Sequence, residues 1–379
     1  MIIVYQKNIN QNRKMSLIHD PIHGDIKVSE IAKKIIDHPY FDRTHYIYQT
    51  GIAYRIYPSA THSRKVHMIG TYAITSKLLE HLNIDSNIKE LICLGGLCHD
   101  IGHGPGSHGF DKYVISKLIK DGKIEKTNNW ITHEQRSIYM FREIAKDLDL
   151  NDDQIDFICK VIDPPIGEKR WEFNIVNNTQ HGIDTDKLDY IARDSYVLGL
   201  RLSIDFDQII KNSRIIDGQW AFSKCIQDEL LNLIFVRYRL HRILNQSRIV
   251  KFDLSYRNIM TKSNKMYSDI ANILNNYDIK GFSKYTDHYV LQNGKKEFIK
   301  KFNQRDAYTI VDRKDSTTSD EDVTLNIKIC KVDSNPMANI PFYDPKSLKL
   351  CNIQKTKIDN ALPCNEVLSY VYKYDTNEL

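Results

Sequence analysis

Apolar residues recur at helical spacing along most of the chain from Ile31 onward. A repeat of apolar positions at i, i+3, i+4 and i+7 is typical of a helix with one buried face. Four stretches show it clearly: 64–82, 88–100, 183–200 and, with one or two breaks, 226–275. The pattern therefore predicts a mainly α-helical protein.

A further helix is predicted from its start signal. Thr132 and Gln135 have the spacing of a capping box, in which each side chain satisfies a free amide of the first turn. We expect the helix that begins there to run to about Leu148.

Strand-like patterns are confined to the two ends of the chain. Residues 1–30 alternate apolar and polar positions around Pro21 and Gly24, which predicts short strands or a hairpin. The tract 312–323 is polar and has no apolar period, as expected of a linker or a disordered loop. After it come three β-like stretches, TLNIKI, LKLCNIQK and VLSYVYKY, which predict a small α/β lobe.

The predicted organisation has four parts. They are an N-terminal strand or hairpin segment (1–30), a helical core domain (31–311), a polar linker (312–323) and a small C-terminal α/β lobe (324–379).

Composition narrows the class of protein. The 379 residues are 41% apolar and 27% charged, as in folded soluble proteins. We expect no membrane span, since no apolar run of about 18 residues occurs. We expect no signal peptide, since the start lacks the order of charged, then apolar, then small residues. Seven cysteines without a C-x-x-C pair favour reduced thiols in an intracellular compartment, cytoplasmic or nuclear. The net charge of +5 suits an anionic substrate but is common in proteins of other functions.

Histidine is concentrated in one region, and this is the first sign of chemistry. Seven of the fourteen histidines lie within residues 62–133. The adjacent pair His99-Asp100 joins a nitrogen ligand to an oxygen ligand, with His67 upstream and Asp186 downstream. Two imidazoles and two carboxylates suit a six-coordinate divalent ion such as Mn, Fe, Zn or Mg, with positions left for water and a phosphate oxygen.

The loop after this pair favours an anionic ligand. Residues 101–109 contain four glycines and a proline, so the preceding helix must stop there. Glycines let the backbone and nearby imidazoles approach an anion closely. His103, His108 and Asp111 follow at once. The alternative is that these histidines are solvated loop residues.

His133 and Glu134 occupy the first turn of their predicted helix. The helix dipole there favours anions and disfavours a charged imidazole. Either His133 has a functional role, or it is an ordinary first-turn residue.

Two further helices carry polar stripes. Lys187, Tyr190 and Asp194 are spaced i, i+3 and i+7 and share a face, which suits phosphate and sugar contacts or an exposed charged surface. Arg237 and His241 lie four residues apart on a mostly apolar helix, where a basic solvated face is the alternative.

Several motifs together resemble one known family. They are DPIHG (20–24), H-x-R-x-x-H (62–67), GGLCHDIGHGPGSH (95–108), THEQ (132–135) and GIDTDKLDYIARD (182–194). The sequence resembles the HD-domain deoxynucleoside triphosphate triphosphohydrolases from about Leu17 to Gln246, and more weakly beyond. Within that family it is most similar to vertebrate members that join a SAM domain to the HD domain. This chain begins just before DPIHG, so we expect no SAM domain in it.

The resemblance implies a helical HD domain that cleaves a dNTP at the α-phosphorus, giving deoxynucleoside and inorganic triphosphate. It implies one divalent transition metal, with Mg on the nucleotide phosphates. The implied metal ligands are His67, His99, Asp100 and Asp186. The implied phosphate contacts are Arg64, His103, His108 and Lys187.

The remaining implied roles concern acid–base chemistry and the nucleoside. His133 matches an acid or base, although His108 is a second candidate for protonating the departing oxygen, and Asp111 and Glu134 match active-site acids. The implied substrate contacts are Gln49, Tyr190, Asp194 and Arg237, with Gln49 and Asp194 at the sugar 3′-hydroxyl; His241 also matches the family. A homodimer or tetramer and a nucleotide activator are further implications.

Departures from the family lie outside the implied metal site. Thr50 replaces a leucine beside the sugar-contacting glutamine, which predicts weaker rejection of the ribose 2′-hydroxyl, and Asn245 replaces a tyrosine near the base. In the activator site Asp37 is kept, but its glutamine and arginine companions are Asp42 and His45. We therefore expect an enzyme that is unregulated or that uses a different activator.

Two other functions fit the sequence. Another HD-domain phosphohydrolase, such as a nucleotidase or a cyclic-nucleotide phosphodiesterase, would share the metal ligands but not the stripe on 187–194. A nucleic-acid-binding module with the HD fold would use the basic helix 236–251 and would bind in a strongly salt-dependent manner.

Overall fold

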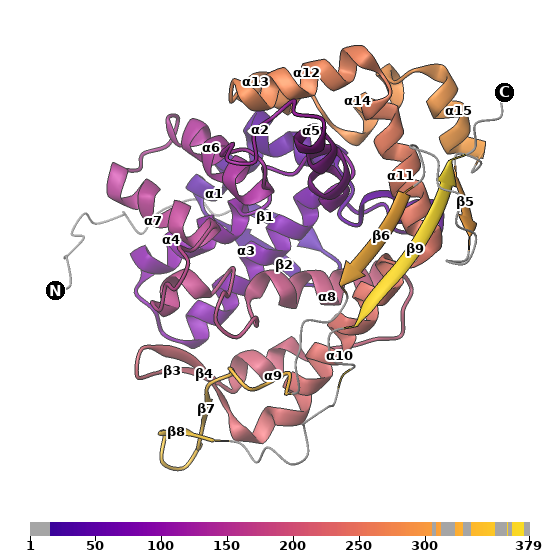
Figure 1. Cartoon of the computed structure of the whole chain (residues 1–379). Helices are drawn as coiled ribbons and strands as arrows, with labels where there is room; N and C mark the ends of the chain where they lie inside the picture. The colour runs from indigo at the N-terminus through magenta and orange to yellow at the C-terminus, as the bar shows by residue number, and fades with distance from the viewer. Residues whose placement is uncertain are drawn as a thin grey trace.

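The computed structural model describes residues 16–304, 308–311, 323–328, 335–352, 362 and 366–374. Helices dominate this part of the chain, and its strands form three small sheets at the edges of the helical body (Figure 1). The prediction of a mainly α-helical protein is confirmed.

The described N-terminal part is a hairpin. Strands β1 (Ser16–Asp20) and β2 (Gly24–Val28) pair antiparallel, and the side chain of Asp20 accepts hydrogen bonds from the amides of the turn. The predicted hairpin is therefore confirmed for these residues, while residues 1–15 lie outside the described part of the chain.

Four helices form the centre of the molecule. Helix α3 (Arg64–His81) packs against α4 (Ser86–Cys98) and α8 (Thr185–Val197), and α7 (Asp152–Ile162) covers α4. Their shared core is fully buried and apolar, with Leu94 as one central residue. This core fixes the ends of α3, α4 and α8, where the predicted metal ligands lie.

Shorter elements surround this centre. They are α1 (Glu30–Asp37), α2 (Pro39–Asp42), the 3-10 turns η1 (Arg43–Tyr46), η2 (Gly51–Arg55), η4 (Trp171–Asn174) and η5 (Lys224–Ile226), the π-helical turn η3 (Phe110–Ile115), α5 (Ser116–Lys120) and α9 (Phe206–Lys211). Helix α6 (His133–Ala145) begins at the predicted capping box, in which Thr132 and Gln135 each bond the other's backbone amide. It ends three residues before the expected Leu148.

The second half of the chain continues as helices. They are α10 (Gln227–Leu244), α11 (Ser247–Thr261), α12 (Asn264–Asn275), α13 (Ile279–Ser283), α14 (Asp287–Asn293) and α15 (Lys296–Gln304). The predicted helical tract 226–275 thus holds α10 to α12 with two breaks. Figure 1 shows α12 to α14 on the same side of the molecule as α2 and α5.

Two small sheets complete the described structure. Strands β3 (Ser213–Ile216), β4 (Gln219–Ser223), β7 (Phe342–Tyr343) and β8 (Leu350–Cys351) form one; β5 (Tyr308–Val311), β9 (Val367–Tyr374) and β6 (Val323–Lys328) form the other. In both sheets, a strand after residue 324 pairs with a strand before residue 312. The described part of 324–379 contains strands joined by turns and no helix. The predicted linker 312–323 lies outside the described residues except for Val323, which begins β6.

None of the described helices is long and apolar enough to cross a lipid bilayer.

Candidate metal centre and active site

The fold brings the four predicted metal ligands together. His67 comes from the first turns of α3, His99 and Asp100 follow α4, and Asp186 lies in the first turn of α8. Asp186 Oδ1 lies 3.0 Å from Nε2 of His67 and 3.4 Å from Nε2 of His99. Asp100 Oδ2 lies 3.6 Å and 3.4 Å from the same two nitrogens.

Hydrogen bonds on the far sides of both imidazoles aim their other nitrogens at one point. Nδ1 of His67 bonds Asp189 (2.7 Å) and Nδ1 of His99 bonds the Gly96 carbonyl (2.8 Å), so in the neutral rings both Nε2 atoms carry lone pairs. These two Nε2 atoms face each other at 3.3 Å. Two lone pairs and two carboxylates at such distances repel one another unless a cation lies between them.

The side chains present therefore fit a divalent metal ion. Without a cation, burial opposes charge on His67 and His99, but the surrounding carboxylates raise the pKa of both rings. Two imidazole nitrogens and two carboxylate oxygens form a donor set typical of Mn, Fe or Zn sites.

A buried carboxylate supports His67 from behind. Asp189 also accepts hydrogen bonds from Arg193 (2.9 and 3.0 Å) and from His23 (2.6 Å), and it is fully buried. A carboxylate behind a metal-binding histidine fixes the tautomer and raises the basicity of the ring. The sequence prediction missed Asp189, although it lies three residues after Asp186 within the quoted GIDTDKLDYIARD motif.

Gly70 explains how this carboxylate reaches α3. A Cβ added at Gly70 would lie 2.0 Å from Asp189 Oδ1 and 2.2 Å from Arg193 Nη2. Only a residue without a side chain therefore leaves room for the pair beside His67.

Arg64 links the metal ligands to the loop that precedes α3. The side chain is buried, pairs with Asp100, and donates to Ser107 Oγ (3.0 Å) and the Gln49 carbonyl (3.1 Å). Burial alone would raise the pKa of Asp100, but the charges of Arg64 and His99 hold it well below its usual value. Asp100 is therefore ionised and available as a ligand.

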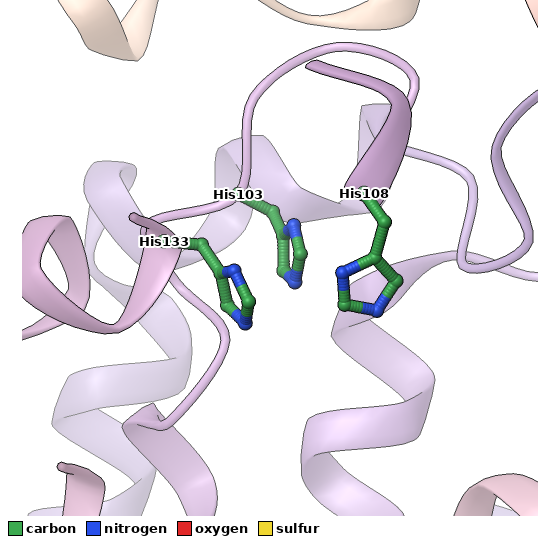
Figure 2. A group of neighbouring side chains, drawn as sticks. All are labelled: His103, His108 and His133. Carbon is green, nitrogen blue, oxygen red and sulfur yellow. The ribbon is translucent and has the colours of Figure 1, made fainter. Parts of the chain in front are cut away.

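Three further histidines meet beside Asp100. Figure 2 shows the rings of His103, His108 and His133 directed into one space from the glycine-rich segment 101–109 and from the start of α6. His103 stacks on His133 at 3.9 Å between ring centres, and His103 Nε2 lies 3.2 Å from Asp100 Oδ1. One nitrogen from each ring lies within 4.8 Å of the others, so the group could also hold a metal ion.

These rings differ in protonation. Desolvation and the Arg64 charge lower the pKa of His103 well below its usual value and that of His108 to about 3. His133 is also desolvated, but its hydrogen bond to Asp111 (3.0 Å) and the Glu134 charge raise its pKa. Of the three rings, His133 is thus the one that binds a proton most readily in the free protein.

Asp111 and Glu134 both lie against His133. Asp111 accepts from the backbone amide (3.0 Å) and the ring of His133, and it pairs with buried Arg136. Burial raises the pKa of Asp111, but Arg136 and His133 lower it to about 2. Glu134 Oε1 lies 3.3 Å from His133 Nε2.

The predicted stripe on α8 faces the same region. Lys187 pairs with Asp184, and the Arg237 guanidinium donates to the Tyr190 hydroxyl at 3.0 Å. The Tyr190 ring centre lies 6.4 Å from that of His67. Burial lowers the pKa of Lys187, but the charges of Asp184, Tyr190 and Asp186 raise it overall, so the ammonium is retained.

The predicted substrate contacts farther from the metal ligands are Asp194, His241 and Asn245. Asp194 bonds His62 (2.7 Å). Burial and the charges of Arg237 and Lys187 lower the pKa of His241 to about 3. The Asn245 amide donates to the carbonyl of His241 on its own helix, and no described contact joins it to the metal ligands.

Gln49 and Thr50 present unused polar atoms. Gln49 Oε1 and Thr50 Oγ1 are inaccessible to solvent and lack a hydrogen-bond partner in the described structure. Buried polar atoms nearly always form a hydrogen bond, so the unused hydrogen-bonding capacity of Gln49 Oε1 and Thr50 Oγ1 suits a ligand.

Comparison with known proteins agrees with this arrangement. Residues 64–194 match the HD domain family model. The chain is 33% identical over 296 residues to a putative HD domain-containing protein, L394, of Acanthamoeba polyphaga mimivirus, covering 72% of this chain and 62% of that protein. It is 29% identical to the deoxynucleoside triphosphate triphosphohydrolase SAMHD1 of Bos taurus (78% and 58% covered) and 27% identical to that of Gallus gallus (94% and 72%).

The chain spans about three fifths of the length of the first two of these relatives. Within that span, the matched domain begins at Arg64 and ends at Asp194, and thus contains the four converging ligands. Residues 64–194 therefore form an HD domain, and the chain is similar over most of its length to the deoxynucleoside triphosphate triphosphohydrolases.

Proposed function

We propose that this protein hydrolyses deoxynucleoside triphosphates to deoxynucleoside and inorganic triphosphate with a divalent metal ion held by His67, His99, Asp100 and Asp186. The observation that carries the proposal is the convergence of these four acceptors beside the basic side chains of Arg64, Lys187 and Arg237. A metal ion with an adjacent cationic pocket suits a substrate that carries several phosphates. The relatives named as triphosphohydrolases support the substrate class.

The reaction that this proposal requires has a simple balance. A water oxygen bonds to the α-phosphorus, the bond from that phosphorus to O5′ breaks, and O5′ takes a proton. The ion bound by the four ligands would polarise a phosphate oxygen and lower the pKa of the attacking water. The triphosphate leaves with the water oxygen.

The side chains around the metal ligands have distinct tasks in this proposal. Arg64, Lys187 and Arg237 offset the negative charge of the triphosphate. We expect the nucleotide to bind with Mg on its phosphates. His133 is the preferred proton donor to O5′, since its pKa is raised while that of His108 is lowered to about 3.

His103 and His108 are assigned to phosphate and His133 to proton transfer, rather than all three to a second metal. The same Arg64 charge that lowers the pKa of His103 and His108 also opposes a second cation. Neutral imidazole N–H groups remain good donors to a phosphate oxygen. In the same proposal Gln49, Tyr190 and Asp194 contact the sugar, and Thr50, His241 and Asn245 line the remaining pocket.

The assignment is tested by identifying the products. The four dNTPs are incubated with the metal-loaded protein and followed by phosphorus NMR, with ribonucleotides in parallel. We expect tripolyphosphate and deoxynucleoside in equal amounts. Release of monophosphate, or cleavage of a cyclic diester, would instead assign another HD-domain phosphohydrolase activity. Salt-dependent nucleic-acid binding without turnover would favour a binding module.

A matched pair of variants ties the products to the site. His99→Ala removes a direct ligand and should lower turnover by more than the 10- to 100-fold that is typical of supporting residues. His81→Ala alters a histidine at the opposite end of α3 and should leave turnover unchanged.

A further inference from the structure

A carboxylate remote from the metal ligands bonds the backbones of both active-site loops. Asp287, the first residue of α14, is 1% exposed. Its Oδ2 accepts from the Tyr48 amide at 2.8 Å, and its Oδ1 accepts from the Gly106 amide at 2.6 Å and the Tyr256 hydroxyl at 2.8 Å. Tyr48 precedes Gln49, and Gly106 lies between His103 and His108 in the sequence.

From Tyr48 a continuous chain of bonds reaches a metal ligand. The Tyr48 carbonyl accepts from Ser107 Oγ at 2.6 Å, and Ser107 Oγ accepts from Arg64 Nε at 3.0 Å. Arg64 in turn pairs with Asp100. Each link is buried or partly buried, so solvent does not readily replace a lost partner.

Arg43 joins the segment before Asp287 to the other end of the same loop. Buried Arg43 donates to the carbonyls of Ile101 and His103, and also to those of Ser283 and Tyr285. The junction between α13 and α14 is therefore bonded to the histidine-rich loop on both sides of its glycines.

An ionised carboxylate at this buried position costs desolvation free energy. Burial raises the pKa of Asp287 to about 6 despite the donors from Tyr48, Tyr256 and Gly106. A neutral apolar side chain would avoid that cost, so packing alone does not account for an aspartate here. Two backbone amides from different loops need two acceptor oxygens, which a carboxylate supplies.

We propose that Asp287 is a positioning residue for the reaction. By holding the Tyr48 and Gly106 amides together, it sets the register of the two loops and, through Ser107 and Arg64, the orientation of Asp100. The inference rests on the proposed function of this site.

The test replaces the carboxylate by its amide. In Asp287→Asn one oxygen becomes an NH₂ group that faces a backbone N–H, so one bridging bond is lost with little change in volume. We expect kcat for dNTP hydrolysis to fall about 100-fold, the scale of a misplacement near 1 Å, while KM changes less than about 3-fold. The visible spectrum of the Co²⁺-loaded protein should change as Asp100 reorients.

Two control variants separate positioning from stability. Tyr256→Phe removes one bond to Asp287 but leaves both backbone bridges. Thr286→Ala removes the side-chain cap of α14 and lowers stability without touching the bridges. Both should keep kcat within about 3-fold of wild type and keep the wild-type Co²⁺ spectrum.

A second variant protects the test if Asp287→Asn does not fold. Ser107→Ala breaks the middle of the chain while leaving Asp287 satisfied, and should reproduce the loss of kcat and the spectral change. Wild-type kcat and a wild-type spectrum in either variant would overturn the proposal. If the wild-type protein hydrolyses no dNTP, the proposed function fails, whereas the Co²⁺ spectra still decide the role of Asp287.

Discussion

At the scale of single residues, Thr50 tests the sugar specificity. Its hydroxyl is buried and unbonded in the described structure, so we expect it to tolerate or bond a ribose 2′-hydroxyl. Thr50→Leu should raise the ratio of kcat/KM for dATP over ATP by about 10-fold, the effect of added apolar bulk in a pocket.

The matched variant for this residue is Thr50→Val, which keeps the volume and removes the hydroxyl. It should give an intermediate ratio. An unchanged ratio in Thr50→Leu would show that this residue does not contact the sugar.

Asp253 tests the electrostatics of the active-site surroundings. Burial raises its pKa to about 7, and Lys112 only partly offsets this. Between its unfolded value near 3.8 and 7, the folded protein binds the extra proton, so this group's contribution to stability falls as the pH rises through that window. Asp253→Asn removes the effect.

We expect Asp253→Asn to gain about 4 kcal/mol in unfolding free energy relative to wild type between pH 4 and pH 8, since the folded and unfolded pKa values differ by about three units, each worth about 1.4 kcal/mol. Urea unfolding of both proteins at these pH values measures the difference. A difference that does not vary with pH would contradict the raised pKa.

The sequence motifs predicted the metal ligands but not the residues that bond those ligands from behind. His67 and Asp186 are 119 positions apart, yet their motif context was enough to pair them, and the fold brings them to 3.0 Å. Asp189 and His23 also lie within quoted motifs, but the bond from Asp189 to the back of His67 depends on how α3 and α8 pack, which the motifs do not show.

At the scale of elements, the close packing of α3 on α8 depends on one glycine. Gly70→Ala would place a methyl group against Asp189 and Arg193, which are buried and paired and cannot move away cheaply. We expect a loss of several kcal/mol in stability, as for overpacking combined with disruption of a buried ion pair, together with weaker metal binding.

The control on a neighbouring helix is Gly96→Ala. Its nearest neighbour, Thr75 Oγ1, would lie 3.2 Å from the new Cβ, so only a small adjustment is required. Thermal melts with and without Mn²⁺ compare the two variants. Equal melting temperatures would show that Gly70 is not needed for the pairing behind His67.

Long periodic helices were predictable, and short elements were not. The predictions for α3, α4 and α8 lie within about three residues of the observed bounds because each helix has a sustained apolar period. Helices α13 and α14 have five and seven residues, too few for a period, and so the junction that holds Asp287 had no sequence signal.

At the scale of the whole molecule, the structure bears on regulation. Two residues at the positions of the family's activator site are bonded within the chain: Asp37 pairs with Lys33, and Asp42 pairs with Lys65. Asp42 stands where the family has an uncharged glutamine, and its negative charge opposes a nucleotide's phosphates. We expect GTP and dGTP to change neither dATP hydrolysis nor the oligomeric mass.

Mass photometry and activity assays with and without GTP check this prediction. A homodimer or tetramer that forms without nucleotide would be compatible with it. GTP-dependent assembly into a tetramer, accompanied by a rise in activity, would refute it.

The domain division remains a proposal at this scale. Strands from the predicted C-terminal lobe complete sheets that begin before residue 312, so we expect removal of 324–379 to destabilise the helical body. Sequence periodicity identified β6, β8 and β9 but not β7, and it could not assign the partners before residue 312, which are more than 50 residues away.

The most direct test of the central claim is a metal titration of the chelated protein, with dNTP hydrolysis measured in the same samples. Mn²⁺ is added stepwise while bound metal is counted by mass spectrometry and tripolyphosphate by phosphorus NMR. We predict that triphosphate release rises in proportion to bound metal and saturates at about one ion per chain, as four converging ligands require. Full hydrolysis in the chelated protein, or a product other than triphosphate at saturation, would contradict the account.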